Sequence, residues 1–162
     1  SVDFKGHIRI PSELVPDAML LRKGDVLFNN TNSVELVGKT VYFDGHNARV
    51  TFSNHITRLR VRTDELSPEY LALWLQHQWR SKVFEGLCDR WVGQAAVQKG
   101  KLEVLEIPAP LLGEQRQIAA RLKAQLAEVE TARQAAAAQL AEIECLPSRL
   151  LAQAFNNGEA TP

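Results

Sequence analysis

The chain has 162 residues, of which 45% are hydrophobic and 23% charged, the composition of a domain that can bury a core. Its 19 Lys and Arg balance 19 Asp and Glu, so overall charge indicates neither a nucleic-acid nor a membrane partner. No apolar run approaches the roughly 20 residues that span a bilayer, and the N-terminal sequence is not typical of a signal peptide. Two cysteines cannot build a disulfide framework, which favours the cytoplasm.

Residues 1–111 predict a mixed domain of the α+β class. Short β-type runs alternate with clusters of Asn, Gly and Asp, and the expected strands are Val26–Phe28, Leu36–Phe43, Arg49–Phe52 and Ile56–Val61. In the last run, arginines alternate with Leu59 and Val61. This period of two predicts one apolar face and one face that carries Arg58, Arg60 and Arg62.

A helix is expected to begin at Ser67-Pro68-Glu69, which combines an N-cap serine, a proline in the first turn and an early acid. Its apolar stripe continues to Phe84, and Gly86 is the expected end. A less regular stretch follows, up to Lys101. Pro108-Ala109-Pro110 then marks a boundary, because proline removes a backbone donor and restricts the residue before it.

Residues 114–145 contain no Gly or Pro and consist mainly of good helix formers. At 1.5 Å per residue this helix would be roughly 48 Å long, which is long for a domain of this size. Seven positions, all apolar except Arg133, recur at spacings of four and three, as in the seam of a coiled coil: Leu122, Leu126, Val129, Arg133, Ala136, Leu140 and Ile143. The alternative is a surface helix packed on its own domain. Pro147 is expected to interrupt the helix, with a short helix over 148–155 and a C-cap at Asn157-Gly158.

Catalytic signatures are absent from the sequence, which has no phosphate-binding glycine loop, zinc-ligand spacing or serine-hydrolase motif. We therefore predict no enzyme activity and no metal site in this chain. Two segments are locally basic. Residues 39–62 contain five Lys or Arg and one acid, and residues 80–101 contain five Lys or Arg and two acids. Such segments suit phosphate contacts, although a solvated strand face explains the arginines equally well.

Five polar residues, Asn29-Asn30-Thr31-Asn32-Ser33, follow the first predicted strand. Asparagine amides present a donor and an acceptor together, the pattern that reads adenine in a major groove. The same residues are also common in turns, so composition alone leaves both interpretations open.

Several segments, in order, resemble the specificity subunits of type I restriction-modification systems. The segment from Leu21-Arg22-Lys23-Gly24-Asp25 to Asn29 resembles the target-recognition domain, as do Val37-Gly38-Lys39-Thr40 and Tyr70–Leu75. The segment from Lys101 through Ile107-Pro108-Ala109-Pro110 to Glu114-Gln115-Arg116-Gln117 is similar to the junction at which a proline-bearing strand leads into the spacer helix. The ending from Leu146 to Phe155 resembles the end of that helix.

The resemblance implies a non-catalytic DNA-binding subunit of a bacterial defence system. In the family, two recognition domains each read half of a split target in double-stranded DNA, and two helices hold them apart as an antiparallel coiled coil. Methyltransferase subunits modify adenine with S-adenosylmethionine, and translocase-nuclease subunits join for cleavage. No cofactor is expected in this chain itself.

The sequence resembles half of such a subunit, with residues 1–111 as the recognition domain and 112–162 as the spacer and dimerisation helix. The N-terminal part of the recognition domain is expected to be missing. A second copy, or another specificity half, would cover the apolar seam, and an antiparallel homodimer would read a split palindrome. The rival interpretation is an interaction-only protein that binds restriction-modification subunits through its coiled coil without reading DNA.

Residue type and loop position give the predicted DNA contacts. Groove contacts are assigned to Asn29, Asn30, Thr31, Asn32, Ser33 and Lys39, and phosphate contacts to Arg58, Arg60, Lys99 and Lys101. The predicted dimer seam consists of Leu122, Leu126, Val129, Ala136, Leu140 and Ile143.

Overall fold

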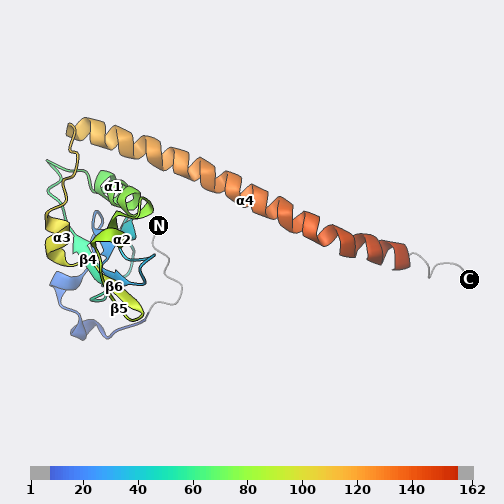
Figure 1. The fold of residues 1–162 in the computed structure, drawn as a ribbon, viewed down its shortest axis with the longest axis horizontal. Coiled ribbons are helices and arrows are strands. Elements are labelled where there is room, and N and C mark those ends of the chain that lie inside the picture. The colour runs from blue at the N-terminus through green and yellow to red at the C-terminus, as the bar shows by residue number, and fades with distance from the viewer. Residues whose placement is uncertain (1–7, 157–162) are drawn as a thin grey trace, which may run out of the picture. The chain divides into compact units, whose positions relative to one another are not determined.

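The computed structural model of the chain describes residues 8–156. The chain divides into two compact units, residues 1–119 and residues 120–162. The first unit combines two small antiparallel sheets with short helices, and the second belongs to one long helix (Figure 1). The predicted α+β class with a long C-terminal helix is confirmed.

The two sheets share one segment of chain. In the first sheet, β1 (Val26–Asn29) lies between β3 (Thr40–Tyr42) and β4 (Ile56–Leu59). In the second sheet, β6 (Gln94–Ala96) lies between β2 (Thr31–Asn32) and β5 (Asp89–Trp91). All pairings are antiparallel. Because only Asn30 separates β1 from β2, a single run of backbone joins both sheets.

Helix α1 (Pro68–Arg80) begins as predicted, since the Ser67 hydroxyl accepts a hydrogen bond from the Tyr70 backbone N–H. It does not continue to Gly86. Lys82 adopts a left-handed φ of 61°, which separates α1 from the short helix α2 (Val83–Leu87). Gly86 therefore lies inside α2. Two 3-10 turns, η1 (Ser12–Leu14) and η2 (Asp17–Met19), precede the sheets.

The core lies between the sheets and α1–α2 and includes Val26, Phe28, Leu71, Leu75 and Phe84. The Phe28 and Phe84 rings meet edge to face, with centroids 5.0 Å apart. Gly38 backs onto Phe84 with φ +87°, and a Cβ there would overlap the ring. The core thus requires glycine at the base of the loop that precedes β3.

Two strand predictions were too long or wrong. Residues Ser33–Gly38 form turns, in which Leu36 and Val37 donate backbone hydrogen bonds to Ser33, so β3 begins only at Thr40. Residues Arg49–Phe52 form no strand. Their contacts are instead with the N-terminal segment, where Leu21 donates its N–H to Val50 and the Thr51 hydroxyl donates to the Met19 carbonyl.

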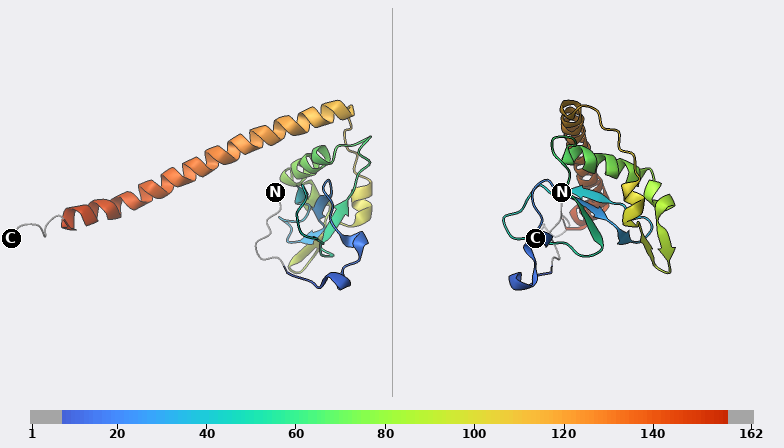
Figure 2. Two further views of the ribbon diagram at one scale, coloured as in Figure 1. Left: turned by 180° about the vertical axis from the view of Figure 1, so that it is seen from behind. Right: turned by 90° about the vertical axis from the view of Figure 1, so that its left-hand side faces the viewer.

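The segment from Cys88 to Leu111 also differs from the prediction. It contains the β5–β6 hairpin and the short helix α3 (Lys99–Glu103), followed by irregular chain up to Leu111. The expected proline-bearing strand is absent from the described residues, because each of the two prolines removes a backbone N–H that a strand would need. Figure 2 shows this segment from two further sides.

Helix α4 (Leu112–Asn156) passes through Pro147 without a break, so the predicted interruption and separate second helix are wrong. One proline removes one intrahelical donor, and the helix-forming residues on both sides keep the helix intact. The predicted C-cap at Asn157-Gly158 lies outside the described residues. No helix among residues 8–156 is long and apolar enough to cross a membrane.

The first turn of α4 is fixed to the α+β unit by Gln115, whose side chain is fully buried. Its Oε1 accepts the Ser67 backbone N–H at 2.8 Å, and its Nε2 donates to the carbonyls of Pro110 and Glu65. Helix α4 therefore begins at Leu112, close to the predicted domain boundary at residues 111 and 112. The boundary itself stays a prediction.

Candidate nucleic-acid interface

The predicted groove-contact residues all lie in one loop region, residues 29–39, which we call the polar loop. Backbone hydrogen bonds close it, because the Asn29 N–H donates to the Lys39 carbonyl at 3.0 Å and the Gly38 N–H donates to the Asn29 carbonyl at 2.7 Å. Trp79 adds a bond from its Nε1 to the Glu35 carbonyl at 2.8 Å. These bonds therefore hold Asn29–Ser33 and Lys39 close together in the polar loop.

Asn30 holds the two sheets together. Its backbone N–H donates to the His55 carbonyl at the start of β4, and its carbonyl accepts the Val97 N–H just after β6. Its side-chain Nδ2 donates to the Asn54 carbonyl and the Thr57 hydroxyl, while Oδ1 accepts from the Thr31 hydroxyl. Both amide hydrogens are occupied, so this conformation leaves no Asn30 donor for a base edge.

The neighbouring polar side chains differ in their environment. Asn32 is exposed, and its Oδ1 accepts the Ser33 N–H. Asn29 Oδ1 is buried without a hydrogen-bond partner among the described residues. Lys39 is exposed at the end of the loop, with its Nζ 5.6 Å from the centre of the Trp79 ring. Within the polar loop, Asn32 and Lys39 are thus the most accessible of the predicted contacts.

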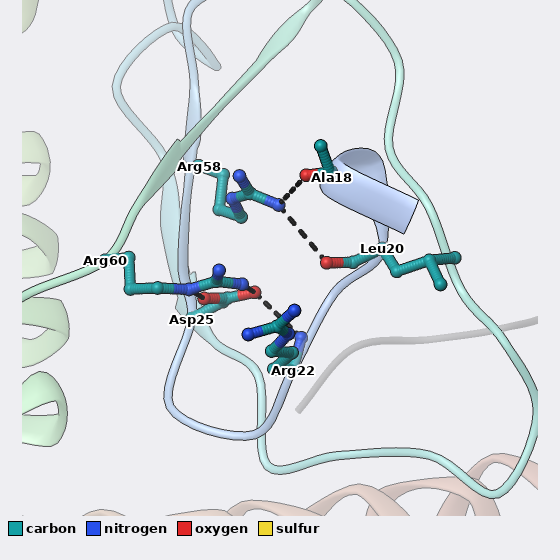
Figure 3. Close-up of polar contacts among 6 residues, drawn as sticks. All are labelled: Ala18, Leu20, Arg22, Asp25, Arg58 and Arg60. Atoms are coloured by element: carbon teal, nitrogen blue, oxygen red, sulfur yellow. Dashed lines mark hydrogen bonds and ion pairs between the residues drawn. The ribbon is translucent and has the colours of Figure 1, made fainter. Parts of the chain in front are cut away.

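Arg58 and Arg60 lie on the β4 side of the first sheet, where other parts of the chain already use their guanidinium groups (Figure 3). Arg58 donates to the carbonyls of Ala18 and Leu20 at 2.8 and 3.2 Å, and its Cζ lies 5.3 Å from the Phe52 ring centre. Arg60 makes a bidentate ion pair with Asp25, with bonds of 2.7 and 2.8 Å. Both arginines hold the chain around β1, and their phosphate role stays a prediction.

The Asp25 carboxylate is 1% exposed, whereas the Arg60 side chain is 41% exposed. Burial opposes the negative charge and by itself would raise the pKa of Asp25. The hydrogen bonds from Arg60 and from the Arg22 backbone N–H, together with the positive charges of Arg60 and Arg58, outweigh burial and lower that pKa. Asp25 is therefore an ionised anchor in the Gly-Asp turn that precedes β1.

Lys99 and Lys101 stand two residues apart on α3 and have different surroundings. Lys99 is exposed and pairs at 3.2 Å with Glu103 on the next turn of the helix. Lys101 is partly buried, and its Nζ bonds the Leu87 carbonyl and the Asp89 carboxylate at the base of the β5–β6 hairpin. Of these two predicted phosphate contacts, Lys99 is the accessible one and Lys101 supports the hairpin.

The polar loop and the β5–β6 hairpin belong to one sheet, because β2 pairs with β6 from Thr31 to Ala96 and from Asn32 to Ala95. The hairpin carries two exposed residues that are not among the predicted DNA contacts, Trp91 and Gln94. Strands of three residues show almost no periodicity in sequence. The Val92-Gly93 dipeptide was the available signal for a turn between them.

The predicted seam lies along α4. Four of its large apolar side chains are about half exposed or more: Leu126, Val129, Leu140 and Ile143, at 48, 63, 56 and 60%. Ala136 is also exposed, and Leu122 is partly buried. The apolar positions persist on one face of the helix, and the coiled coil itself stays a prediction.

The described residues hold no group of three or more His, Cys, Asp or Glu side chains that could bind a metal ion. The fold is an α+β unit with accessible polar loops, followed by a long helix. The sequence model of the type I restriction modification DNA specificity domain matches residues 16–139, more than half of the chain. The chain belongs to this family, as its sequence predicted.

A relative from Methanocaldococcus jannaschii, assigned as the specificity subunit of the type I restriction enzyme MjaX, is 33% identical over 96 residues. The matched residues make up 59% of this chain and 23% of the relative. The chain thus spans less than a quarter of the length of the relative that it matches.

Proposed function

We propose that this chain reads DNA sequence for a type I restriction-modification enzyme. The observation that carries the proposal is the family match, because residues 16–139 include the polar loop, the β5–β6 hairpin and most of α4. The accessible amide of Asn32 and the cations of Lys39 and Lys99 supply base-edge and phosphate chemistry on that unit.

The chemistry of modification and cleavage belongs to partner subunits in this proposal. A methyltransferase subunit would bind S-adenosylmethionine and methylate adenine, and a translocase-nuclease subunit would cleave. This chain would recognise the target DNA sequence, since its polar loop presents amides and cations without a paired nucleophile and base.

A second copy of the chain would complete the reader. Exposed Leu126, Val129, Leu140 and Ile143 give α4 an apolar face that an identical antiparallel helix would cover. Two copies related by a twofold axis would present the same recognition surface twice, so the target would be a split palindrome.

The same seam supports a second candidate, an interaction-only protein that binds restriction-modification subunits through α4 without reading DNA. It requires only the exposed apolar face of the helix. The two candidates differ in one observable, which is whether DNA sequence affects binding.

Co-expression of the chain with a methyltransferase subunit from the same locus tests both candidates, with adenine methylation mapped across the host genome. We expect methylation at a split palindromic motif. A complex that co-purifies but adds no methylation would favour the interaction-only candidate.

A matched pair of variants tests the seam in the same experiment. Ala136→Glu places a charge on the seam, whereas Ala138→Glu places it two residues away, on the opposite face of the heptad. Ala136→Glu should convert the dimer to a monomer in sedimentation equilibrium and abolish methylation, and Ala138→Glu should change neither. Equal behaviour of the two variants would contradict the antiparallel coiled coil.

A further inference from the structure

The β5–β6 hairpin has an outer face that the register defines. Residues paired across antiparallel strands share a face, and residues two apart along a strand share it too. The pairs Trp91–Gln94, Asp89–Ala96 and Thr31–Ala96 therefore place five side chains on one face: Thr31, Asp89, Trp91, Gln94 and Ala96. The opposite face carries Ala95, which is fully buried, together with Asn32 and Arg90, which are exposed. On the outer face, Trp91 and Gln94 near the tip are exposed, and the other three residues are partly buried.

The tip of this hairpin is apolar and accessible. Trp91 is 57% exposed and Val92 is fully exposed, while Gly93 takes a φ of +77° in the turn. The other two tryptophans, Trp74 and Trp79, pack against the core. Trp91 gains no comparable burial within the described chain, which marks the tip as a contact surface.

The base of the hairpin is anchored to the α+β unit. Ala95 and Val97 anchor β6 in the core, and Lys101 fixes the start of β5 through Leu87 and Asp89. Arg90 adds a bond of 2.8 Å from its guanidinium to the Glu85 carbonyl. Such anchoring lowers the conformational entropy that the base of the hairpin would lose on binding.

Charge and dimensions favour duplex DNA as the partner. The exposed cations Arg90 and Lys99 lie on the hairpin and shortly after it, and the acid on the outer face, Asp89, is neutralised by Lys101. A strand of three residues reaches about 10 Å at roughly 3.4 Å per residue. A major groove is about 8.5 Å deep and admits a two-stranded ribbon.

We propose that the β5–β6 hairpin enters the major groove of the target, with Gln94 reading a base edge and Trp91 and Val92 making apolar contact at the tip. A glutamine amide can bond adenine N6 and N7 together, and apolar side chains contact the thymine methyl group. The inference rests on the proposed function and names the part of the surface that sets the target sequence.

Selection from a randomised double-stranded DNA library with the full-length chain tests the inference. Gln94→Ala should lose discrimination at one base pair by about 5-fold to 150-fold, because a bidentate amide contact is missing. Gln117→Ala, at an exposed glutamine on α4, is the matched control and should select the motif of the unsubstituted chain.

Val92→Asp tests the tip without disturbing any packed residue, because Val92 is fully exposed. A carboxylate in the groove should weaken binding to the selected site at least about 10-fold, since phosphates and base acceptors repel it. Val104→Asp, at a residue that is 76% exposed outside the hairpin, should bind like the unsubstituted chain. Thermal unfolding of all variants checks that the fold is retained.

The outcomes separate the two proposals. If the unsubstituted chain selects a motif, and Gln94→Ala and Val92→Asp select it with unchanged affinity, the hairpin inference is wrong and sequence reading stands. If the unsubstituted chain selects no motif, both fail.

Discussion

Two basic regions of the α+β unit look alike in sequence and differ in structure. On the β4 side, Arg58 and Arg60 are bonded to backbone carbonyls and to the buried Asp25. In the polar loop Lys39 is exposed, and on α3 the Lys99 side chain is 82% exposed, compared with 41% for Arg60. A count of charges cannot separate these regions, because the acid that binds Arg60 lies 35 residues away in sequence. Accessible cations identify a nucleic-acid surface better than basic residues as such.

The largest expected effect concerns Gly38, where the polar loop packs against the Phe84 ring. Gly38→Ala should lower the free energy of unfolding by more than about 3 kcal/mol, because it adds a Cβ against the Phe84 ring at a φ of +87°. Gly100→Ala, with open space around it in α3, should leave stability unchanged or raise it by up to about 1 kcal/mol. Urea unfolding measures both. A tolerated Gly38→Ala would show that the loop does not depend on the core.

The next effect tests the structural use of Arg60. Asp25→Asn should destabilise the fold by about 2 kcal/mol, because a buried amide cannot replace the charge-assisted hydrogen bonds that the carboxylate accepts from Arg60 and from the Arg22 N–H. Asp17→Asn removes an exposed partner of Arg49 and should cost less than about 1 kcal/mol. Equal losses in urea unfolding would mean that burial does not distinguish the two pairs.

The same carboxylate gives a pH dependence. The pKa of Asp25 is lower in the folded chain than in the unfolded chain, so the unfolded chain binds its proton first as the pH falls. The stabilisation from ionised Asp25 is therefore fully present above about pH 4 and is lost as the pH falls through the folded-state pKa. Unfolding measured from pH 6 to pH 2 should show a steeper acid loss for the unsubstituted chain than for Asp25→Asn. Parallel curves would contradict this assignment.

A smaller effect should separate two asparagines of the polar loop. Asn30→Ala removes side-chain bonds to Asn54, Thr57 and Thr31, and should cost about 1–2 kcal/mol of stability. Asn32→Ala, at an exposed side chain, should leave stability within about 0.5 kcal/mol and alter the selected DNA motif instead. The reverse pattern would exchange their roles.

The smallest effect concerns phosphate contact. Lys99→Ala should leave stability within about 0.5 kcal/mol, since its pair with Glu103 is exposed, and should weaken binding to every DNA sequence. The slope of log affinity against log salt should fall by about 1. Anisotropy titrations over a salt series measure this slope. Unchanged affinity and slope would remove Lys99 from the interface.

Local signals predicted the parts of the fold that depend on neighbours in sequence. The α1 cap at Ser67-Pro68 and strand β1 were predicted because capping and apolar runs act over a few residues. The break between α1 and α2 at Lys82 and the continuation of α4 through Pro147 were not predicted. Each depends on whether the surrounding packing and helix propensity outweigh one unfavourable residue.

In the candidate site, too, some features could be predicted from the sequence and others could not. The polar loop could be located from its five consecutive polar residues, and the structure does gather them with Lys39. The internal use of Asn30 could not be predicted, because it depends on Asn54 and Thr57 in a strand that pairs with β1. The hairpin was missed because three-residue strands carry too little pattern.

The polar loop is closed mainly by main-chain hydrogen bonds, among them those between Asn29 and Lys39, Gly38 and Asn29, and Leu36 and Ser33. Such bonds do not depend on side-chain identity. The outward side chains of Glu35, Leu36 and Lys39 can therefore be exchanged without dismantling the loop that carries them. Under the proposed function, substitutions at these exposed positions would change the recognised DNA sequence while the main-chain hydrogen bonds keep the loop folded.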